Sequence, residues 1–303
     1  MDKKKITVVG SSNTDMTVKT SHLPVPGETV IGGEFTKGPG GKGANQAVAA
    51  SRLGAEVCLV CKVGKDSFGS EAIAHYKEEG IDTQSIILSD KPSGTALITV
   101  DDNGENCIVV APGANGDVTV EDIRSAADAI RSAGILLMQL EIPDDAVAEA
   151  ARIAREAGVM VVLNPAPASR TLSEEVFRNV DLMIPNETEL ELFTGRAVKD
   201  TGSVLEAVTI LRDKGVRDII VTLGSKGSVV CPEDGSITFV EARQVKAVDT
   251  TAAGDTFCAG VCVGLSEGMT LVQAARFATA ASALTVQKLG AQNSLPHRKD
   301  VIL

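Results

Sequence analysis

The sequence feature that most constrains the fold is a series of short apolar runs separated by amphipathic segments of helical length. The runs are rich in Val, Ile and Leu and lack polar alternation, which is typical of strands buried on both faces. They span residues 5–10, 56–64, 134–140, 159–164, 182–186 and 218–224. Segments with helical periodicity, such as 144–158 and 203–215, lie between them. This alternation predicts a mainly parallel central sheet with helices on both faces, in a single α/β domain over residues 1–303.

Two segments break the alternation of strands and helices. Residues 13–37 and 94–110 contain short strands of alternating polarity and the turn sequences Pro24–Gly27 and Asp101–Gly104. Alternating strands joined by such turns are typical of antiparallel hairpins. We therefore expect the two segments to form a small antiparallel β lid at one edge of the core.

Composition narrows the possible classes of function. The net charge is −11 and basic residues form no long run, which argues against a nucleic-acid or anionic-membrane surface. Aromatic residues make up 3% of the chain, so we expect a polar ligand to be held by hydrogen bonds rather than by stacking. The histidines lie near no cysteine cluster, and Cys58 and Cys61 point to opposite faces of a predicted strand, so no zinc site is expected. No targeting or membrane-spanning stretch is visible, which predicts a cytoplasmic protein.

The stretch Gly38–Gly43 matches the pattern G-x-G-x-x-G of dinucleotide-binding folds. It does not follow the first strand, whose own turn reads GSSNTD, and Gly43 rather than Ser or Thr follows Lys42. Neither a dinucleotide fingerprint nor a Walker A loop therefore fits. The stretch does supply backbone that can approach a ligand, a helix N-terminus, the cation of Lys42 and the amide of Asn45. A tight turn that simply opens a helix is the alternative.

A second glycine turn, Ala252–Asp255, leads from an extended segment into a helix of small residues. Small residues let the first N–H groups of a helix face an anion, with the helix dipole behind them. Asp255 lies where a carboxylate could take a proton from a hydroxyl beside that anion. A phosphate-holding helix N-terminus with an adjacent base favours phosphoryl transfer to an alcohol. A first-turn Asp that only stabilises its helix is the alternative.

Several motifs together resemble the phosphofructokinase-B-type carbohydrate kinase family, and its ribokinase branch in particular. GPGGKGANQAVAASRLG is similar to the first family signature, and DTTAAGDTF to the second. GSSNTD, LLMQLE, LNPAPA, IPNETE and VTLGSKG are similar to ribokinase motifs in the expected order, so the resemblance covers nearly the whole chain. It implies a ribokinase-like three-layer fold with a β lid. It also implies ATP-dependent phosphorylation of D-ribose at the 5-hydroxyl.

The resemblance assigns roles to residues at strand ends and glycine turns. The residues implied to hold the sugar hydroxyls are Asn13, Asp15, Gly41, Lys42, Asn45 and Glu141. Asp255 would be the general base that removes the proton of the 5-hydroxyl. An anion hole for the transferring phosphoryl group would be formed by the N–H groups of Ala252, Ala253, Gly254 and Asp255. The family often has Gly at position 252, and Ala252 is expected to contribute its N–H only if its φ is negative.

The resemblance also implies ATP and two kinds of cation. The nucleotide would be held by Asn186, Thr222, Gly224, Ser225 and Gly227. Glu189 would organise Mg²⁺ largely through water, although the segment 186–189 also reads as a helix cap. Many ribokinases carry His at position 279, so an adenine contact of Thr279 stays open. An activating K⁺ beside the anion hole would be held by Asp249, Thr251, Thr285, Lys288, Gly290 and Ser294, unless Asp249 only caps its turn.

Alternative functions stay open at this point. Within the family, deoxyribose, another sugar or a nucleoside could be the substrate. A non-catalytic sugar-binding regulator on the same fold is a different class, against which an intact Asp255 argues. A nicotinamide-dependent oxidoreductase rests only on the glycine pattern. The resemblance further implies a homodimer that forms through the lid.

Overall fold

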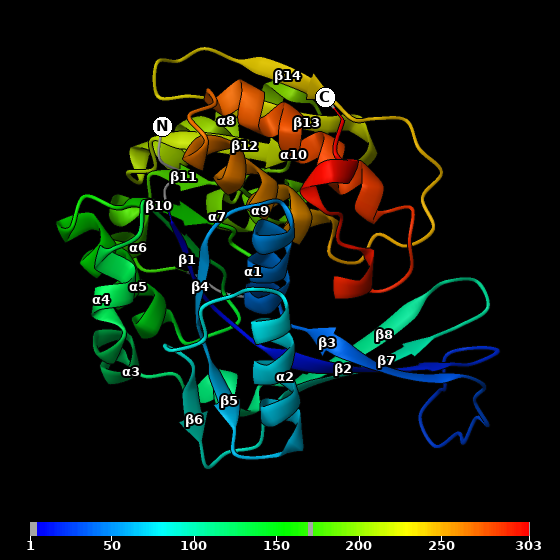
Figure 1. Ribbon diagram of the computed structural model, residues 1–303. Helices are drawn as coiled ribbons and strands as arrows, with labels where there is room; N and C mark the ends of the chain where they lie inside the picture. Colours follow the sequence, from blue (N-terminus) through cyan, green and yellow to red (C-terminus); the bar gives the residue numbers. More distant parts are fainter. Residues whose placement is uncertain (1–4, 169–171, 303) are drawn as a thin grey trace.

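The computed structural model describes residues 5–168 and 172–302, so the remaining residues of the predicted domain lie outside the description. Its central sheet has eight strands in the order β14-β13-β12-β11-β10-β9-β1-β4 (Figure 1). The strands are β1 (Ile6–Val9), β4 (Val57–Val60), β9 (Ile135–Met138), β10 (Met160–Leu163), β11 (Leu182–Met183), β12 (Asp218–Thr222), β13 (Gly227–Cys231) and β14 (Thr238–Glu241). From β4 to β12 neighbouring strands are parallel, and β13 is antiparallel to both of its neighbours. The predicted mainly parallel sheet is confirmed.

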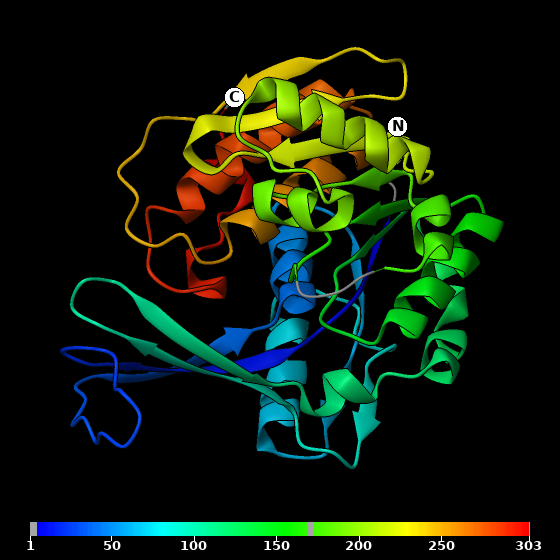
Figure 2. The same ribbon diagram turned by 180° about the vertical axis from the view of Figure 1, so that it is seen from behind.

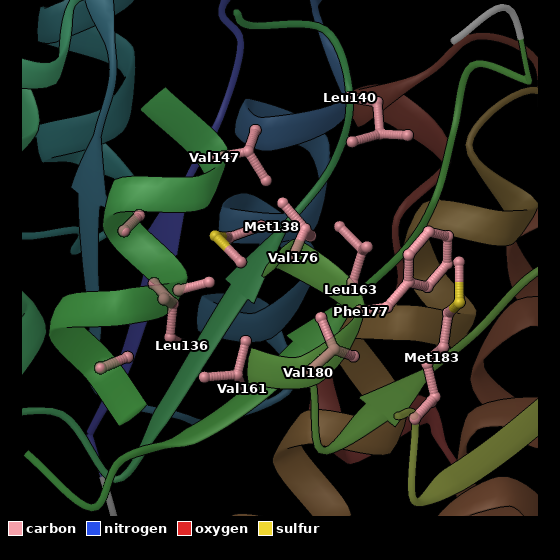
Figure 3. Packing of buried hydrophobic residues seen from close by; sticks show 14 of the residues in the cluster. Leu136, Met138, Leu140, Val147, Val161, Leu163, Val176, Phe177, Val180 and Met183 are labelled. Carbon is pink, nitrogen blue, oxygen red and sulfur yellow. The ribbon is translucent and has the colours of Figure 1, made fainter. Parts of the chain in front are cut away.

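Helices cover both faces of this sheet (Figure 2). One face carries α1 (Lys42–Arg52), α2 (Ser67–Glu78), α9 (Ala253–Ser266) and α10 (Leu271–Thr285). The other carries α3 (Val120–Ser125), α4 (Ala127–Arg131), α5 (Asp144–Glu156), α6 (Glu174–Asn179), α7 (Glu187–Thr194) and α8 (Thr201–Asp213). Alternate residues of each strand point to opposite faces. In β9, Leu136 and Met138 join the cluster beneath α3–α8 (Figure 3), and Leu137 joins the opposite one. Both faces are apolar, which explains the uninterrupted apolar runs.

A four-stranded sheet extends away from this core (Figure 1). Its order is β3-β2-β7-β8, with β2 (Asn13–Lys19), β3 (Phe35–Gly40), β7 (Gly94–Val100) and β8 (Asn106–Ala111). The expectation that these strands are antiparallel throughout is wrong, because β2 and β7 pair in parallel. Each is the first strand of its own hairpin, and both leave the core side by side, with Asn13 opposite Gly94. The two hairpins therefore meet through strands that run the same way.

Helices α9 and α10 pack closely because small residues face one another. A Cβ added at Gly260 would lie 2.8 Å from the Cα of Ala278, and one at Gly264 would lie 2.9 Å from the Cα of Ala274. Contacts this short are open only to glycine. The small-residue composition of α9 thus fixes how this helix, and the turn that opens it, sits on the sheet.

No helix within the described residues is both long and apolar enough for a membrane span.

Candidate active site

The candidate site lies where β1 and β9 end and where α1 and α9 begin. Asp255, in the first turn of α9, is 6% exposed and faces α1. Its Oδ2 accepts a hydrogen bond from Asn45 Nδ2 at 3.0 Å, and its Oδ1 accepts one from Gln46 Nε2 at 3.0 Å. The two glycine turns that are far apart in the sequence therefore meet at one carboxylate.

The glycines before α1 allow a close approach between two stretches of backbone. Gly41 has φ +88°, and a Cβ on it would lie 2.7 Å from the Asn13 nitrogen. A Cβ on Gly43 would lie 2.5 Å from the Ser11 nitrogen. The first turn of α1 is thereby seated on the loop after β1, where the N–H of Ala44 donates to the Ser11 carbonyl at 2.8 Å. In this structure the G-x-G-x-x-G stretch serves the packing of α1 against β1.

Acidic groups from three elements gather beside Asp255. Glu141 Oε2, after β9, accepts hydrogen bonds from the backbone N–H of Lys42 at 3.0 Å and from Ser11 Oγ. Burial, together with the nearby carboxylates of Glu141 and Asp255, raises the pKa of Asp15 to about 6. Burial alone would lower the pKa of Lys42, but the carboxylates of Asp255, Glu141 and Glu189 raise it above its usual value. Lys42 is therefore a cation held among carboxylates.

The amides of Asn13 and Asn45 are already engaged by other amides. Asn13 Oδ1 accepts a hydrogen bond from Asn115 Nδ2 at 2.7 Å, and Asn115 also bonds the backbone of Ser12 in both directions. Asn45 Oδ1 accepts from Gln292 Nε2 at 3.1 Å. Each predicted residue is thus held in one orientation, with part of its hydrogen-bonding capacity left for a ligand.

The turn that opens α9 differs from the expectation at one residue. Ala252 has φ +59°, so the negative φ required for its predicted contribution is absent. Ala252 takes the left-handed conformation that glycine usually provides, because the chain must reverse sharply before α9. The N–H of Ala253 donates to the Thr250 carbonyl at 3.2 Å. The N–H groups of Gly254 and Asp255 belong to the first turn, which has no preceding helical carbonyls to accept them.

The predicted nucleotide residues occupy neighbouring strand ends. Asn186 and Thr222 form a β-bridge, and a Cβ on Gly227 would lie 2.1 Å from the Val240 carbonyl oxygen. Asn186 and Glu189 also form a reciprocal helix cap, with N···O distances of 2.9 and 2.8 Å. Ser225 lies in the short helical turn 224–226 after β12.

Thr279 lines a cavity of about 490 Å³ between the end of β14 and α10. Other lining residues are Val240, Glu241, Arg243, Met269 and Arg276. Glu241 pairs with Gly227, so the cavity borders the 224–227 loop. It lies beside the predicted nucleotide residues rather than over the cluster around Asp15.

The residues predicted to hold K⁺ lie on two loops that are tied together. Asp249 accepts hydrogen bonds from the N–H of Thr251 at 2.9 Å and from the N–H of Gly290 at 2.8 Å. These bonds outweigh the opposite effect of burial and hold the pKa of Asp249 below its usual value. Further along, Lys288 N donates to the Thr285 carbonyl at 3.1 Å, and Ser294 Oγ donates to the Ala291 carbonyl at 2.7 Å.

Some residues of this region were missed by the sequence reasoning. Gln46, Gln139 and Asn115 are buried amides that bond to predicted residues or to one another, and Gln292 does the same from a short helical turn. Their only signal is an amide within an otherwise apolar or small-residue stretch. Asn164, which begins the polar part of the LNPAPA motif after β10, accepts a hydrogen bond from Gln46 Nε2 at 3.0 Å.

Comparison with known proteins places the chain in a family. The family model described as pfkB family carbohydrate kinase matches residues 3–298. The chain belongs to the pfkB family of carbohydrate kinases. The kinase is similar to a ribokinase of Haemophilus influenzae, with 43% identity that covers 99% of this chain and 98% of that protein.

A deoxyribokinase of Salmonella typhi is 37% identical to the kinase, covering 96% of this chain and 95% of that protein. Among solved structures, an Arabidopsis thaliana ribokinase complexed with ribose and ATP superposes with a TM-score of 0.91. It is 33% identical, covering 99% of this chain and 98% of that one. The family and the fold implied by the sequence motifs are confirmed.

The positive φ of Ala252 predicts that glycine is the better residue there. An L-residue in this conformation costs about 1–2 kcal/mol, and glycine loses roughly 0.5–1 kcal/mol of that gain through backbone entropy. We expect Ala252→Gly to raise the free energy of unfolding in urea by roughly 0.5–1 kcal/mol. Ala253→Gly, one residue later in the helix, is the control and should lower it. An equal loss in both variants would contradict the strain at Ala252.

Proposed function

We propose that this kinase transfers the γ-phosphoryl group of ATP to the 5-hydroxyl of D-ribose, and is thus a ribokinase. The observation that carries the proposal is the buried Asp255 carboxylate, which stands at the N-terminus of α9 within a cluster of sugar-reading groups. The similar proteins named ribokinase and the one bound to ribose and ATP support the choice of substrate and cofactor.

In this proposal the sugar lies against the start of β2 and the start of α1. Asp15, Lys42 and Glu141 offer acceptors and a donor to its hydroxyls, together with the unused capacity of Asn13 and Asn45. Gly41 would border the sugar through its backbone. Asp255 takes the proton of the 5-hydroxyl as that oxygen attacks phosphorus. The N–H groups of Gly254 and Asp255 receive the negative charge of the transferring phosphoryl group.

ATP is proposed to lie along the ends of β11 and β12. Asn186 and Thr222 would face its phosphates, and Gly224, Ser225 and Gly227 would form the loop over its ribose. The cavity lined by Val240, Met269 and Thr279 is apolar enough at its walls to receive the adenine. This arrangement directs the phosphates toward Asp255 and the N-terminus of α9.

The residues present fit the two proposed cations. Mg²⁺ prefers oxygen ligands and keeps much of its water, and the buried Glu189 carboxylate interacts with the charges of Asp255 and Lys42. When bound it would neutralise phosphate charge. Asp249 stays ionised and can hold K⁺ with oxygen atoms of Thr251, Thr285, Lys288, Gly290 and Ser294. That ion would hold the 249–251 and 285–294 loops so that the turn opening α9 keeps its shape.

The lid is proposed to join two copies of the chain. Its strands expose large apolar side chains, including Phe35 at 58%, Leu97 at 54% and Ile108 at 51%. Exposed apolar strands are stabilised by a partner surface. A second copy would cover these side chains near the sugar residues of β2, and a mass determination by light scattering tests this dimer.

We assign the reaction to the cytoplasm, where ATP is available; a tagged chain recovered outside that compartment would contradict this.

Substrate class and base can be tested together. ADP formation should be accelerated by ribose more than by 2-deoxyribose, fructose or adenosine. Asp255→Asn removes the proton acceptor but keeps the size of the side chain, so we expect kcat to fall by about 10²–10⁴-fold while ATP still binds. A preference for 2-deoxyribose would correct the substrate, and a variant that keeps more than about a tenth of kcat would remove Asp255 from the role of base.

The raised pKa of Asp15 predicts a pH dependence of sugar binding. Because this pKa is about 6, the carboxylate is ionised at pH 7.5 and becomes protonated below pH 6. Protonation removes a hydroxyl acceptor, so KM for ribose should rise as pH falls through 6 while KM for ATP changes little. Asp15→Asn, which does not titrate, should flatten this response.

The same shift predicts an effect on stability. A carboxyl whose pKa is raised by folding adds stability at low pH, and this stability is lost as pH rises through 6. Asp15→Asn should therefore raise the thermal midpoint at pH 7.5 even though it weakens ribose binding. A lowered midpoint would mean that Asp15 supports the fold rather than the sugar.

The cation proposal predicts a specific response to K⁺. Activity should rise when K⁺ replaces a bulky organic cation at equal ionic strength, because the loop pair that flanks α9 becomes fixed. Asp249→Ala should abolish the increase, whereas Asp234→Ala, which changes an exposed turn elsewhere, should retain it. Equal kcat/KM in both buffers for the unaltered chain would contradict the site.

A further inference from the structure

A buried chain of side-chain amides ends on Asp255. Gln46, on α1, is fully buried, and its Nε2 donates to Asp255 Oδ1 and to Asn164 Oδ1, each at 3.0 Å. Its Oε1 accepts from Gln139 Nε2 at 2.5 Å. The amide of Gln46 thus connects the ends of β9 and β10 with the first turn of α9.

The orientation of the Gln46 amide is determined by the groups to which it is hydrogen-bonded. Asn164 Nδ2 donates to the Ile184 carbonyl at 3.1 Å, so Asn164 can present only its oxygen to Gln46. An ionised Asp255 offers acceptors alone. If the Gln46 amide were turned over, its oxygen would face these two acceptors and its NH₂ would face the NH₂ of Gln139. Only one orientation satisfies all of the contacts, and it points a donor at Asp255.

Stability alone does not account for the amides. Within the described residues, Gln139 Oε1 is buried without a hydrogen-bond partner and lies against the Gly10 backbone. A buried acceptor without a partner is unfavourable, and an apolar side chain of similar size would avoid that loss. What Gln139 does accomplish is to hold the Gln46 amide in its single orientation. The row of amides therefore serves to fix the position of the Asp255 carboxylate.

We propose that Gln46 is a positioning residue for the general base, an inference that rests on the proposed function. Gln46 holds Oδ1 and Asn45 holds Oδ2, so the carboxylate cannot rotate about its terminal bond without breaking a hydrogen bond. The lone pairs that remain on the carboxylate are thereby directed toward the attacking hydroxyl. Gln46 itself contacts neither sugar nor nucleotide in this arrangement.

Gln46→Met tests the proposal, because methionine has similar length and volume but no donor. A misdirected catalytic group lowers the rate of the chemical step rather than the affinity for substrate, so we expect kcat to fall by about 10–100-fold. KM for ribose and for ATP should stay within about threefold, since the binding groups are unchanged. Thr7→Val is the matched control: it removes the part-buried hydrogen bond from Thr7 Oγ1 to the Ala129 carbonyl of α4, on the face of the sheet opposite α9, and should leave kcat unchanged.

A double variant separates positioning from general destabilisation. If Gln46 acts through the Asp255 carboxylate, adding Gln46→Met to Asp255→Asn should lower the residual kcat by less than about twofold. A full further loss in the double variant, a wild-type kcat in Gln46→Met, or a loss confined to KM would each overturn the proposal. Should Gln46→Met fail to fold, Gln46→Leu, which is smaller and also lacks the donor, should show the same loss of kcat.

The controls also separate this inference from the proposed function. An unaltered chain that phosphorylates no sugar would contradict the function, whatever Gln46 does. An active chain in which Asp255→Asn is also active would contradict the base. An active chain that needs Asp255 but tolerates Gln46→Met would contradict the positioning role alone.

Discussion

Two amides from consecutive residues of α1 hold the carboxylate of Asp255 on α9, and the rest of the site depends on this contact. The contact requires α1 and α9 to begin at the same place on the sheet edge. Glycines at 41 and 43 allow this for α1, because its first turn rests directly on the backbone after β1. Gly260 and Gly264 allow it for α9, because they let α10 hold that helix close. The small residues therefore allow Asn45 and Gln46 to reach Asp255.

The electrostatics of the site follow from the same geometry. Burial and the nearby carboxylates of Glu141 and Asp255 raise the energy of the ionised form of Asp15, and the pKa of Asp15 is raised accordingly. Lys42 offsets part of this repulsion from within the cluster. The fold thus loses some stability at neutral pH by keeping the Asp15 carboxylate in this cluster, where we propose that it binds a sugar hydroxyl. Such strain among like charges is common at functional sites.

Much of the fold could be predicted from the sequence, because strands buried on both faces carry uninterrupted apolar runs and parallel strands need helical connections. The parallel pairing of β2 with β7 could not, since it depends on how two distant hairpins leave the core. For the site, quoted motifs identified Asp15, Glu141 and Asp255, and the structure brings these together. Gln46 and Gln139 were missed because a buried amide resembles any other polar residue until its partner is known. The sign of φ at Ala252 stayed open, because alanine rarely adopts the left-handed conformation although the family often has Gly there.

We propose that the Asp255 carboxylate is held facing the hydroxyl that receives the phosphoryl group. A crystal structure of the chain with ribose and a non-hydrolysable ATP analogue tests it most directly. We expect the 5-hydroxyl oxygen within about 2.6–3.2 Å of an Asp255 carboxylate oxygen, with the γ-phosphate at the N-terminus of α9. We also expect that the bonds from Asn45 and Gln46 to that carboxylate persist. A sugar bound with its 5-hydroxyl turned away from Asp255, or a γ-phosphate remote from α9, would contradict the account.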